Sequence, residues 1–327
     1  MKSRYLVFKQ TGDPQQVVEI GERELAPLKP NEVRMKTHFA PINPADLNFI
    51  QGNYGRPSHP PAIPGHESAG IVIETGAEVS SLQAGDAVIP LVGAGCWAEH
   101  LTAEAQFFAK LPEGTDLAQA SMLRVNPVTA WHFLHHFVAL EPGDWVLQNA
   151  ANSGVGRSVI QVAKKLGLRT LNLVRRPELI PELKALGADE MLIDDDNAIT
   201  AARIILGGKE AKLAGNAVGS DSAIRLMEML SPEGTLVTYG AMSKRSMKVP
   251  NKFLIFKNLI LRGLWITRWL EHATPDEWFD VLHPLAEMTH RGSLKTAVDH
   301  VYPLERHQEA LSRASSDSRG GKVLLKF

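Results

Sequence analysis

The chain has 327 residues, more than a single hydrophobic core usually supports, so two domains are expected. Lysine and arginine total 35 against 36 aspartate and glutamate, and the resulting charge of -1 argues against a dedicated nucleic-acid or membrane-surface binder. The single cysteine, Cys96, excludes an intramolecular disulfide and a multi-cysteine zinc site.

The first part of the chain, from Met1 to about Met122, is predicted to be β-rich. Hydrophobicity alternates over 32–39, and short apolar runs bounded by turn residues follow at 69–74 and 87–91. The N-terminus passes directly into a strand-like segment without leader features, and no apolar run approaches the ~20 residues that span a bilayer. From these features we expect a cytoplasmic protein without a membrane segment.

Strands and helices alternate through the middle of the chain, which predicts a parallel sheet with helices on both faces. The C-terminal tail mixes helix and strand patterns and ends in a strand, so we assign it to the first domain. We therefore expect an α/β domain over 123–266 and a discontinuous β-rich domain formed by 1–122 and 267–327. The expected strands are 145–149, 170–174, 190–193, 213–218, 235–239, 259–265 and 322–327, and the expected helices are 155–166, 178–186, 198–206, 222–230, 275–291 and 304–314.

The first strand of the α/β domain runs into a glycine-containing turn that is typical of dinucleotide binding. Glycine lacks a Cβ, so the backbone can approach a pyrophosphate, which would lie at the N-terminus of the following helix. The spacing departs from G-x-G-x-x-G because an asparagine and a serine stand among the glycines. The turn residues expected to contact the cofactor are Asn152, Ser153, Gly154, Val155 and Gly156.

Two arginines, Arg175 and Arg176, end the second strand of this unit, where an acidic residue would normally bind the ribose of NAD. An arginine there can pair with the 2'-phosphate of NADP. The pattern therefore predicts NADP(H), with Arg175 as the first candidate and Arg176 as the second. The alternative is a solvated basic loop.

The chain resembles the medium-chain dehydrogenase/reductase superfamily in its β-rich first half, its Gly-His-Glu motif at 65–67 and its Rossmann unit. A narrower set of segments, 43–55, 125–130, 148–156 and 261–265, resembles the mitochondrial-type trans-2-enoyl thioester reductases. That resemblance implies a doubly wound Rossmann sheet with a GroES-like catalytic domain, and NADPH-dependent, zinc-independent reduction of the 2,3 double bond of enoyl-ACP or enoyl-CoA. Ser220 departs from the family, which usually has glycine there.

The resemblance implies three catalytic candidates. Tyr54 takes the position of the family's tyrosine, whose phenol can hydrogen-bond an oxyanion and give up a proton. Without the resemblance, a tyrosine in this turn would be expected only to anchor a loop. Trp265 falls where the family has a tryptophan near the substrate, with Trp269 a weaker candidate; a plain core or interface aromatic is the alternative for both. Asn43 is a candidate to hydrogen-bond the nicotinamide ribose or a substrate oxygen.

Further candidates surround the expected cofactor and substrate. Thr129 is expected to touch the nicotinamide, and the turn that carries Tyr239, Gly240 and Met242 follows a strand at its C-terminal end, where such folds bind ligands. The apolar run 253–256 is predicted either to line an acyl pocket or to be core. A mostly apolar strand over 259–264 could pair with a second copy across a two-fold axis, so a homodimer is expected.

No metal site is predicted. Zinc-dependent members of the superfamily use a cysteine where this chain has Asn43, and His66 alone does not make a tetrahedral site. His66 and Glu67 are therefore interpreted as structural or pocket residues. The spacing of three histidines could place them on one face of a helix, and a partly exposed face is favoured over a metal site because no carboxylate or cysteine nearby completes a ligand set. They are His132, His135 and His136.

The sequence thus predicts an NADPH-dependent oxidoreductase that acts on trans-2-enoyl thioesters. An NADPH:quinone oxidoreductase of the same superfamily is the enzymatic alternative, with a quinone in place of the acyl thioester. A non-catalytic NADPH-binding sensor or structural protein is the alternative from another class. Acyl chain length, and coenzyme A versus an acyl carrier protein as the carrier, stay open.

Overall fold

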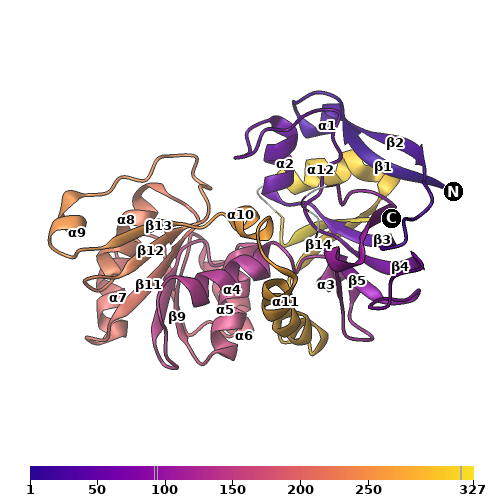
Figure 1. The fold of residues 1–327 in the computed structure, drawn as a ribbon. Coiled ribbons are helices and arrows are strands. Elements are labelled where there is room, and N and C mark those ends of the chain that lie inside the picture. Colours follow the sequence, from indigo (N-terminus) through magenta and orange to yellow (C-terminus); the bar gives the residue numbers. More distant parts are fainter. Residues whose placement is uncertain (92, 94, 317–318) are drawn as a thin grey trace. The chain divides into compact units, whose positions relative to one another are not determined.

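The computed structural model describes residues 1–91, 93, 95–316 and 319–327. The chain forms two compact units, Met1–Val125 with Thr267–Phe327, and Asn126–Ile266 (Figure 1). The first unit is built from both ends of the chain, and its N-terminal part ends at Val125 rather than at the expected Met122. Within the described residues, no helix combines the length and the apolar character needed to cross a membrane.

The second unit contains a six-stranded sheet in the order β10-β9-β8-β11-β12-β13. Every neighbouring pair is parallel, so the predicted parallel sheet is confirmed. Numbered within the unit this order is 3-2-1-4-5-6, the Rossmann order, which reverses between β8 and β11. The strands are β8 (Trp145–Gln148), β9 (Arg169–Val174), β10 (Glu190–Ile193), β11 (Ala211–Asn216), β12 (Thr235–Thr238) and β13 (Ile260–Gly263).

Helices bury apolar side chains against both faces of this sheet. One core contains Leu147 and Leu171 with residues of α7 and α8, and the other contains Val174 with residues of α5 and α6. This two-sided burial explains why the strands are apolar on both faces. The helices are α4 (Asn126–His136), α5 (Gly154–Lys165), α6 (Ile180–Leu186), α7 (Ala198–Leu206), α8 (Ser220–Met229) and α9 (Asn251–Ile255), with a 3-10 turn at Pro177–Leu179.

The apolar run 253–256 is divided between the core and the surface of this unit. Phe253 is buried in the core that α7 and α8 share, whereas Leu254, Ile255 and Phe256 are exposed, the last by 81%. The helix α9 is only five residues long, so it presents a single large side chain to the core. The core alternative therefore holds for Phe253, and a role of the other three residues in an acyl pocket stays a prediction.

The first unit is built around a seven-stranded sheet with the strand path β14-β15-β3-β4-β5-β7, in which β6 also pairs with β3. A hairpin of β1 and β2 forms a separate two-stranded sheet. The closing strand β15 pairs antiparallel with β3 and parallel with β14, which explains why the C-terminal tail belongs to this unit. The strands are β1 (Lys2–Phe8), β2 (Val18–Glu24), β3 (Glu32–Pro41), β4 (Ala69–Thr75), β5 (Ala87–Pro90), β6 (His100–Glu104), β7 (Phe108–Lys110), β14 (Val298–Pro303) and β15 (Lys322–Lys326).

The helices of the chain ends are short except for α11. They are α1 (Pro14–Val17), α2 (Pro44–Gln51), α3 (Leu117–Ala120), α10 (Ile266–Leu270), α11 (Pro275–His290) and α12 (His307–Ser315), with 3-10 turns at Ala105–Phe107 and Leu304–Arg306. The core beneath α12 joins residues from both ends of the chain, including Phe8, Ile50, Leu311 and Leu325. This shared core holds the discontinuous unit together.

An ion pair fixes α12 to β14 and gives a testable pH dependence. Arg313 Nε and Nη2 donate to Asp299 Oδ2 and Oδ1 at 2.6 and 2.7 Å. These bonds lower the pKa of Asp299 to about 2. A carboxyl whose pKa is lower in the folded state stabilises the fold above its unfolded pKa of about 3.9, and that stabilisation disappears as the pH falls toward 2. Asp299→Asn should therefore lower the melting temperature at pH 6, and the difference from the parent protein should shrink between pH 4 and pH 2.

Asp280→Asn on the exposed face of α11 is the matched control for this measurement. Thermal unfolding across the pH range should give nearly parallel curves for the control and the parent protein. A gap between parent and Asp299→Asn that stayed constant down to pH 2 would contradict the assigned pKa.

Candidate active site

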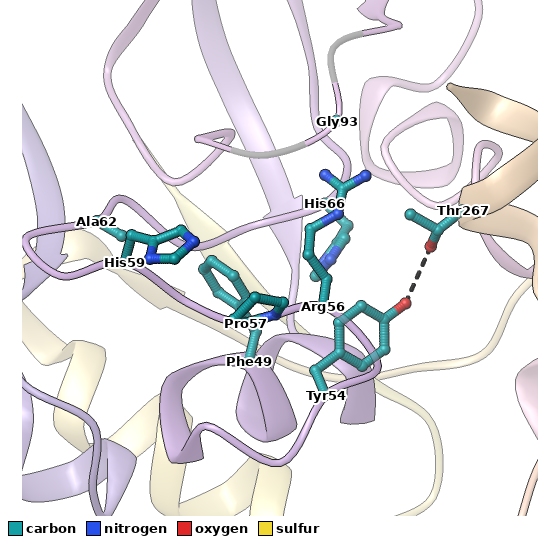
Figure 2. Close-up of a pocket in the computed structure, with 9 residues that line it drawn as sticks. All are labelled: Phe49, Tyr54, Arg56, Pro57, His59, Ala62, His66, Gly93 and Thr267. Carbon is teal, nitrogen blue, oxygen red and sulfur yellow. Dashed lines mark hydrogen bonds between the residues drawn. The ribbon is translucent and has the colours of Figure 1, made fainter. Parts of the chain in front are cut away.

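A cavity of about 240 Å³ in the first unit is the starting point for the site (Figure 2). The helix α2 leads to it: Asn43 is its N-cap and Gly52 ends it with φ of 76°, a conformation that favours glycine. The chain then turns into the cavity wall at Tyr54. The lining residues are Phe49, Tyr54, Arg56, Pro57, His59, Ala62, His66, Gly93 and Thr267.

Tyr54 places a phenolic hydroxyl on this largely apolar wall. Its Oη lies 2.9 Å from Thr267 Oγ1, and either atom can be the donor. Its ring meets the imidazole of His66 edge-on, with ring centroids 5.4 Å apart. In Figure 2 the hydroxyl points toward Thr267. A hydroxyl held in this way can donate a hydrogen bond or a proton to a bound molecule.

The fully buried carboxylate of Asp46 fixes the position of His66. Asp46 Oδ1 accepts from the His66 backbone N–H at 3.0 Å and lies 2.5 Å from His66 Nδ1. The other oxygen, Oδ2, accepts from the backbone N–H of Asn43 at 2.7 Å. Because Nδ1 faces Asp46, the orientation of the imidazole ring against Tyr54 is set by α2 itself.

The side chain of Asn43 is part of a buried polar cluster. Its Nδ2 donates to Glu67 Oε1 at 2.8 Å, and Lys322 Nζ donates to its Oδ1. Burial raises the pKa of Glu67 and lowers that of Lys322, so each opposes the other's desolvation through the asparagine between them. The structure thus places Asn43, a predicted ligand contact, with both ends of its amide bonded within the first unit.

In the second unit, the glycine turn leads directly into α5. Ser153 is the N-cap of this helix, and its Oγ accepts from the backbone N–H of Gly156 at 3.1 Å. A Cβ on Gly156 would lie 2.7 Å from the carbonyl oxygen of Ala150, so the close packing of helix on turn requires glycine. The residues Asn152, Gly154 and Val155 are half-buried beside it. The N-terminal N–H groups of this helix could hold an anion.

Gly156→Ala should therefore destabilise the chain by about 1 kcal/mol or more, because the added methyl group meets backbone that cannot move aside easily. Urea unfolding would measure the loss. Gly263→Ala is the matched control, since a Cβ there meets nothing within 4 Å. Equal stabilities for the two variants would show that the helix can shift without cost.

Buried amides that were not predicted as site residues join the strands at the point where the sheet order reverses. Asn149 Nδ2 donates to Asn216 Oδ1 at 2.9 Å and to Ser222 Oγ at 2.8 Å, while Asn149 Oδ1 accepts from Ala217 N at 2.7 Å. The signal was available, because an asparagine follows β8 and another ends β11. These bonds fix the two loops that flank the crevice where Rossmann folds bind dinucleotides.

Arg175 and Arg176 directly follow β9 and are both exposed. Arg176 Nε lies 3.6 Å from Glu178 Oε1. Among the residues that the structure describes, Arg175 makes no ion pair. The strands β8 and β9 are parallel neighbours. The two arginines after β9 and the glycine turn after β8 therefore lie at the same C-terminal end of the sheet.

The turn after β12 lies against the loop after β11. Tyr239 N donates to Asn216 O at 3.0 Å, and Met242 N donates to Ala217 O at 2.9 Å. A Cβ on Gly240 would lie 2.9 Å from the same Ala217 oxygen, so this glycine permits the close approach. Burial raises the pKa of the Tyr239 hydroxyl, whereas the side chain of Met242 is exposed. The predicted turn thus borders the crevice.

The remaining candidates lie on nearby helices and turns. Thr129 is buried on α4. Trp265 follows the strand β13 of the second unit by two residues, and it is 41% exposed. Trp269 packs on Trp278 with ring centroids 5.0 Å apart. The site residues predicted from sequence thus fall into two groups, with Tyr54 and Asn43 in the first unit and the others, apart from Trp269, in the second.

The three histidines of α4 do not share one environment. His132 is buried, whereas His135 and His136 are exposed. The ring of His135 stacks on Trp131 at 4.2 Å, and that of His136 meets His132 edge-on at 4.8 Å. In the described part of the chain, no three or more His, Cys, Asp or Glu side chains group to hold a metal ion.

Comparison with known proteins places the chain in a family. Residues 29–113 match the family model "Alcohol dehydrogenase GroES-like domain", and residues 154–287 match "Zinc-binding dehydrogenase". A human protein named "Enoyl-[acyl-carrier-protein] reductase, mitochondrial" is 39% identical over 328 residues, covering 98% of this chain and 88% of its own length. The chain belongs to the enoyl reductases of the medium-chain dehydrogenase/reductase superfamily. The predicted GroES-like domain and the prediction of an oxidoreductase are confirmed.

Solved structures agree with the fold of this enoyl reductase. A putative NADPH:quinone reductase from Bacillus thuringiensis has a TM-score of 0.92 at 27% identity, over 100% of this chain and 99% of its own. The mitochondrial 2-enoyl thioester reductase Etr1p from Candida tropicalis has been solved in complex with NADP and crotonyl-CoA. That complex has a TM-score of 0.89 at 30% identity, over 100% of both chains.

The predicted cytoplasmic location is wrong. The relatives that match nearly the whole enoyl reductase chain, from Homo sapiens to Dictyostelium discoideum, are named as mitochondrial proteins. The prediction depended on composition and on the first residues of the chain, and neither feature reports the compartment in which a folded enzyme works.

Proposed function

We propose that this enoyl reductase uses NADPH to reduce the 2,3 double bond of trans-2-enoyl thioesters. The observation that carries the proposal is the Tyr54 hydroxyl, held 2.9 Å from Thr267 on the wall of a mainly apolar cavity. The names of the relatives support the substrate class, since the human protein is an enoyl-[acyl-carrier-protein] reductase and the Etr1p complex contains crotonyl-CoA.

Reduction across a conjugated double bond develops negative charge on the thioester oxygen and needs a proton at Cα. When bound, NADPH supplies the hydride to Cβ. In this proposal Tyr54 hydrogen-bonds the thioester oxygen as the charge grows and provides the proton for Cα. The apolar neighbours Phe49, Pro57 and Ala62 exclude water from the bound acyl group, which strengthens that hydrogen bond.

The residues of the second unit fit a phosphorylated dinucleotide. The N-terminus of α5 presents backbone N–H groups to the pyrophosphate, and the exposed guanidinium of Arg175 is available to a 2'-phosphate at the same end of the sheet. The turn 239–242 and the buried Thr129 are proposed to border the nicotinamide half. The relative bound to NADP supports this choice of cofactor.

The competing enzyme function is NADPH:quinone reduction, which the name of the Bacillus thuringiensis neighbour suggests. Purified protein with NADPH and either crotonyl-CoA or a quinone, followed by the loss of NADPH absorbance, separates the two. We expect oxidation with crotonyl-CoA and little with the quinone. Turnover with the quinone alone would overturn the proposal, and binding of NADPH without turnover on any acceptor would favour a non-catalytic role. A comparison of kcat/KM for crotonyl-CoA and for the crotonyl thioester of an acyl carrier protein would identify the preferred carrier.

The edge strand β13 suggests that the enzyme is a homodimer. This strand ends the six-stranded sheet, and Ile260 on it is exposed, as is the neighbouring Trp265. Pairing of two β13 strands across a two-fold axis would satisfy the free backbone groups of this edge and cover those side chains. Analytical ultracentrifugation tests the proposal, and a monomer at micromolar concentration would refute it.

A further inference from the structure

Two contacts tie the turn that carries Tyr54 to one later segment of the chain. Tyr54 Oη lies 2.9 Å from Thr267 Oγ1, and two residues further on Arg56 forms an ion pair with Glu271. All four residues belong to the first unit, and three of them line the same cavity. Thr267 is 7% exposed, so its hydroxyl is shielded from water. Figure 2 displays the first of these contacts at the cavity wall.

We propose that the segment 267–271 positions the proton donor: Thr267 orients the hydroxyl of Tyr54, and the Arg56–Glu271 pair holds the turn from which Tyr54 projects. The inference rests on the proposed function, because it assigns these residues a role through Tyr54. Neither Thr267 nor Glu271 was singled out from the sequence.

The chemistry of a threonine hydroxyl suits this role. A phenol needs its O–H directed at the substrate, and after the proton leaves, the phenolate oxygen needs a donor. The Thr267 hydroxyl can donate a hydrogen bond to the phenolic oxygen in both states, which leaves the phenolic proton for the substrate and then stabilises the phenolate. Since it is already in place at 2.9 Å, little reorganisation is needed during the reaction.

The Arg56–Glu271 pair acts on the backbone of the turn. The turn begins at Gly52, which adopts the left-handed conformation and has no side chain to pack, and reaches Arg56 through Gly55. The side chains of Arg56 and Glu271 are 42% and 31% exposed, so solvent screens their attraction and the pair adds little to overall stability. It can still restrict the turn locally, and a small displacement of a proton donor lowers the rate strongly.

The alternative is that both contacts only close a loop. A contact of that kind would lower activity through stability or substrate affinity, and its loss would add to the loss caused by removing the Tyr54 hydroxyl. A positioning contact acts through that hydroxyl, so its effect should vanish once the hydroxyl is absent. The two readings therefore differ in a double-mutant cycle.

The experiment compares kcat and KM for crotonyl-CoA reduction by the full-length protein and its variants. Thr267→Val removes the hydroxyl at nearly constant volume and should lower kcat by about 10-fold, the value of one neutral hydrogen bond, with KM changed less than about twofold. Thr267→Ser should retain most of the parent kcat. In a Tyr54→Phe background, Thr267→Val should cause no further loss. Glu271→Gln should lower kcat in the parent and leave the Tyr54→Phe variant unchanged.

Three results would overturn the inference: an unchanged kcat in Thr267→Val, a loss that adds fully to that of Tyr54→Phe, or a Thr267→Ser variant as slow as Thr267→Val. If Tyr54→Phe itself keeps full activity, the proposed proton donor is wrong and the positioning role falls with it. That outcome is distinct from a slow Tyr54→Phe paired with an unaffected Thr267→Val, which overturns the positioning role and leaves Tyr54 as the proposed proton donor. Thermal melting of each variant confirms that the compared proteins are folded.

Discussion

Tyr54→Phe is expected to lower kcat for enoyl thioester reduction by about 100-fold or more, which is the usual cost of removing one donor to a developing oxyanion. The change removes only the phenolic oxygen, so the edge-on contact of the ring with His66 stays. The affinity for NADPH should not change, because the proposed cofactor contacts all lie in the second unit. Steady-state kinetics with crotonyl-CoA, and fluorescence titration of NADPH, measure the two quantities.

Tyr302→Phe is the matched control for this prediction. Tyr302 is a mostly buried tyrosine of the same unit, on β14, and it does not line the cavity. Its variant should keep the parent kcat. If Tyr54→Phe raised only KM, the hydroxyl would contribute to binding rather than to the chemical step.

The Rossmann unit could be predicted from sequence because its signals are local. Strand and helix patterns alternate at short intervals, and the turn with Gly154 and Gly156 joins one strand to the next helix. The structure explains why glycine is required at position 156, since a Cβ on Gly156 would meet the backbone of Ala150. The spacing of hydrophobic residues and the residue types found in turns are sufficient for such an inference.

The interior of the candidate site could not be predicted, because its contacts join residues far apart in the chain. Tyr54 meets Thr267, and Asn43 meets Lys322, across more than two hundred residues in each case. Nothing near Asn43 signals that a lysine of the closing strand will bond its amide. Only the antiparallel pairing of β15 with β3 brings the lysine there.

The sequence also could not show which residues of the short helix α9 are buried. An apolar run carries no information on which of its side chains meet the core, and at five residues the helix is too short for its pattern to show a buried face. Phe253 is buried there, whereas Phe256 is exposed.

Arg175→Ala is expected to weaken NADPH binding by about 10-fold or more and to leave NADH binding nearly unchanged. A hydrogen bond between charged groups contributes about 1.5–3 kcal/mol, and one factor of 10 corresponds to about 1.4 kcal/mol. NADH lacks the 2'-phosphate, so the loss should appear for one cofactor only. Fluorescence titration of both cofactors against the parent and the variant gives the four dissociation constants that the comparison needs.

Arg176→Ala is the matched control, because Arg176 follows the same strand but lies 3.6 Å from Glu178, which competes with a phosphate for its charge. Its replacement should weaken NADPH by less than that of Arg175. Since the contact is between charges at an exposed edge, the preference for NADPH over NADH should also decrease as salt is added. Equal losses of NADPH and NADH in Arg175→Ala would show that the arginine supports the turn, and the phosphate contact would then have to be sought elsewhere along the same sheet edge.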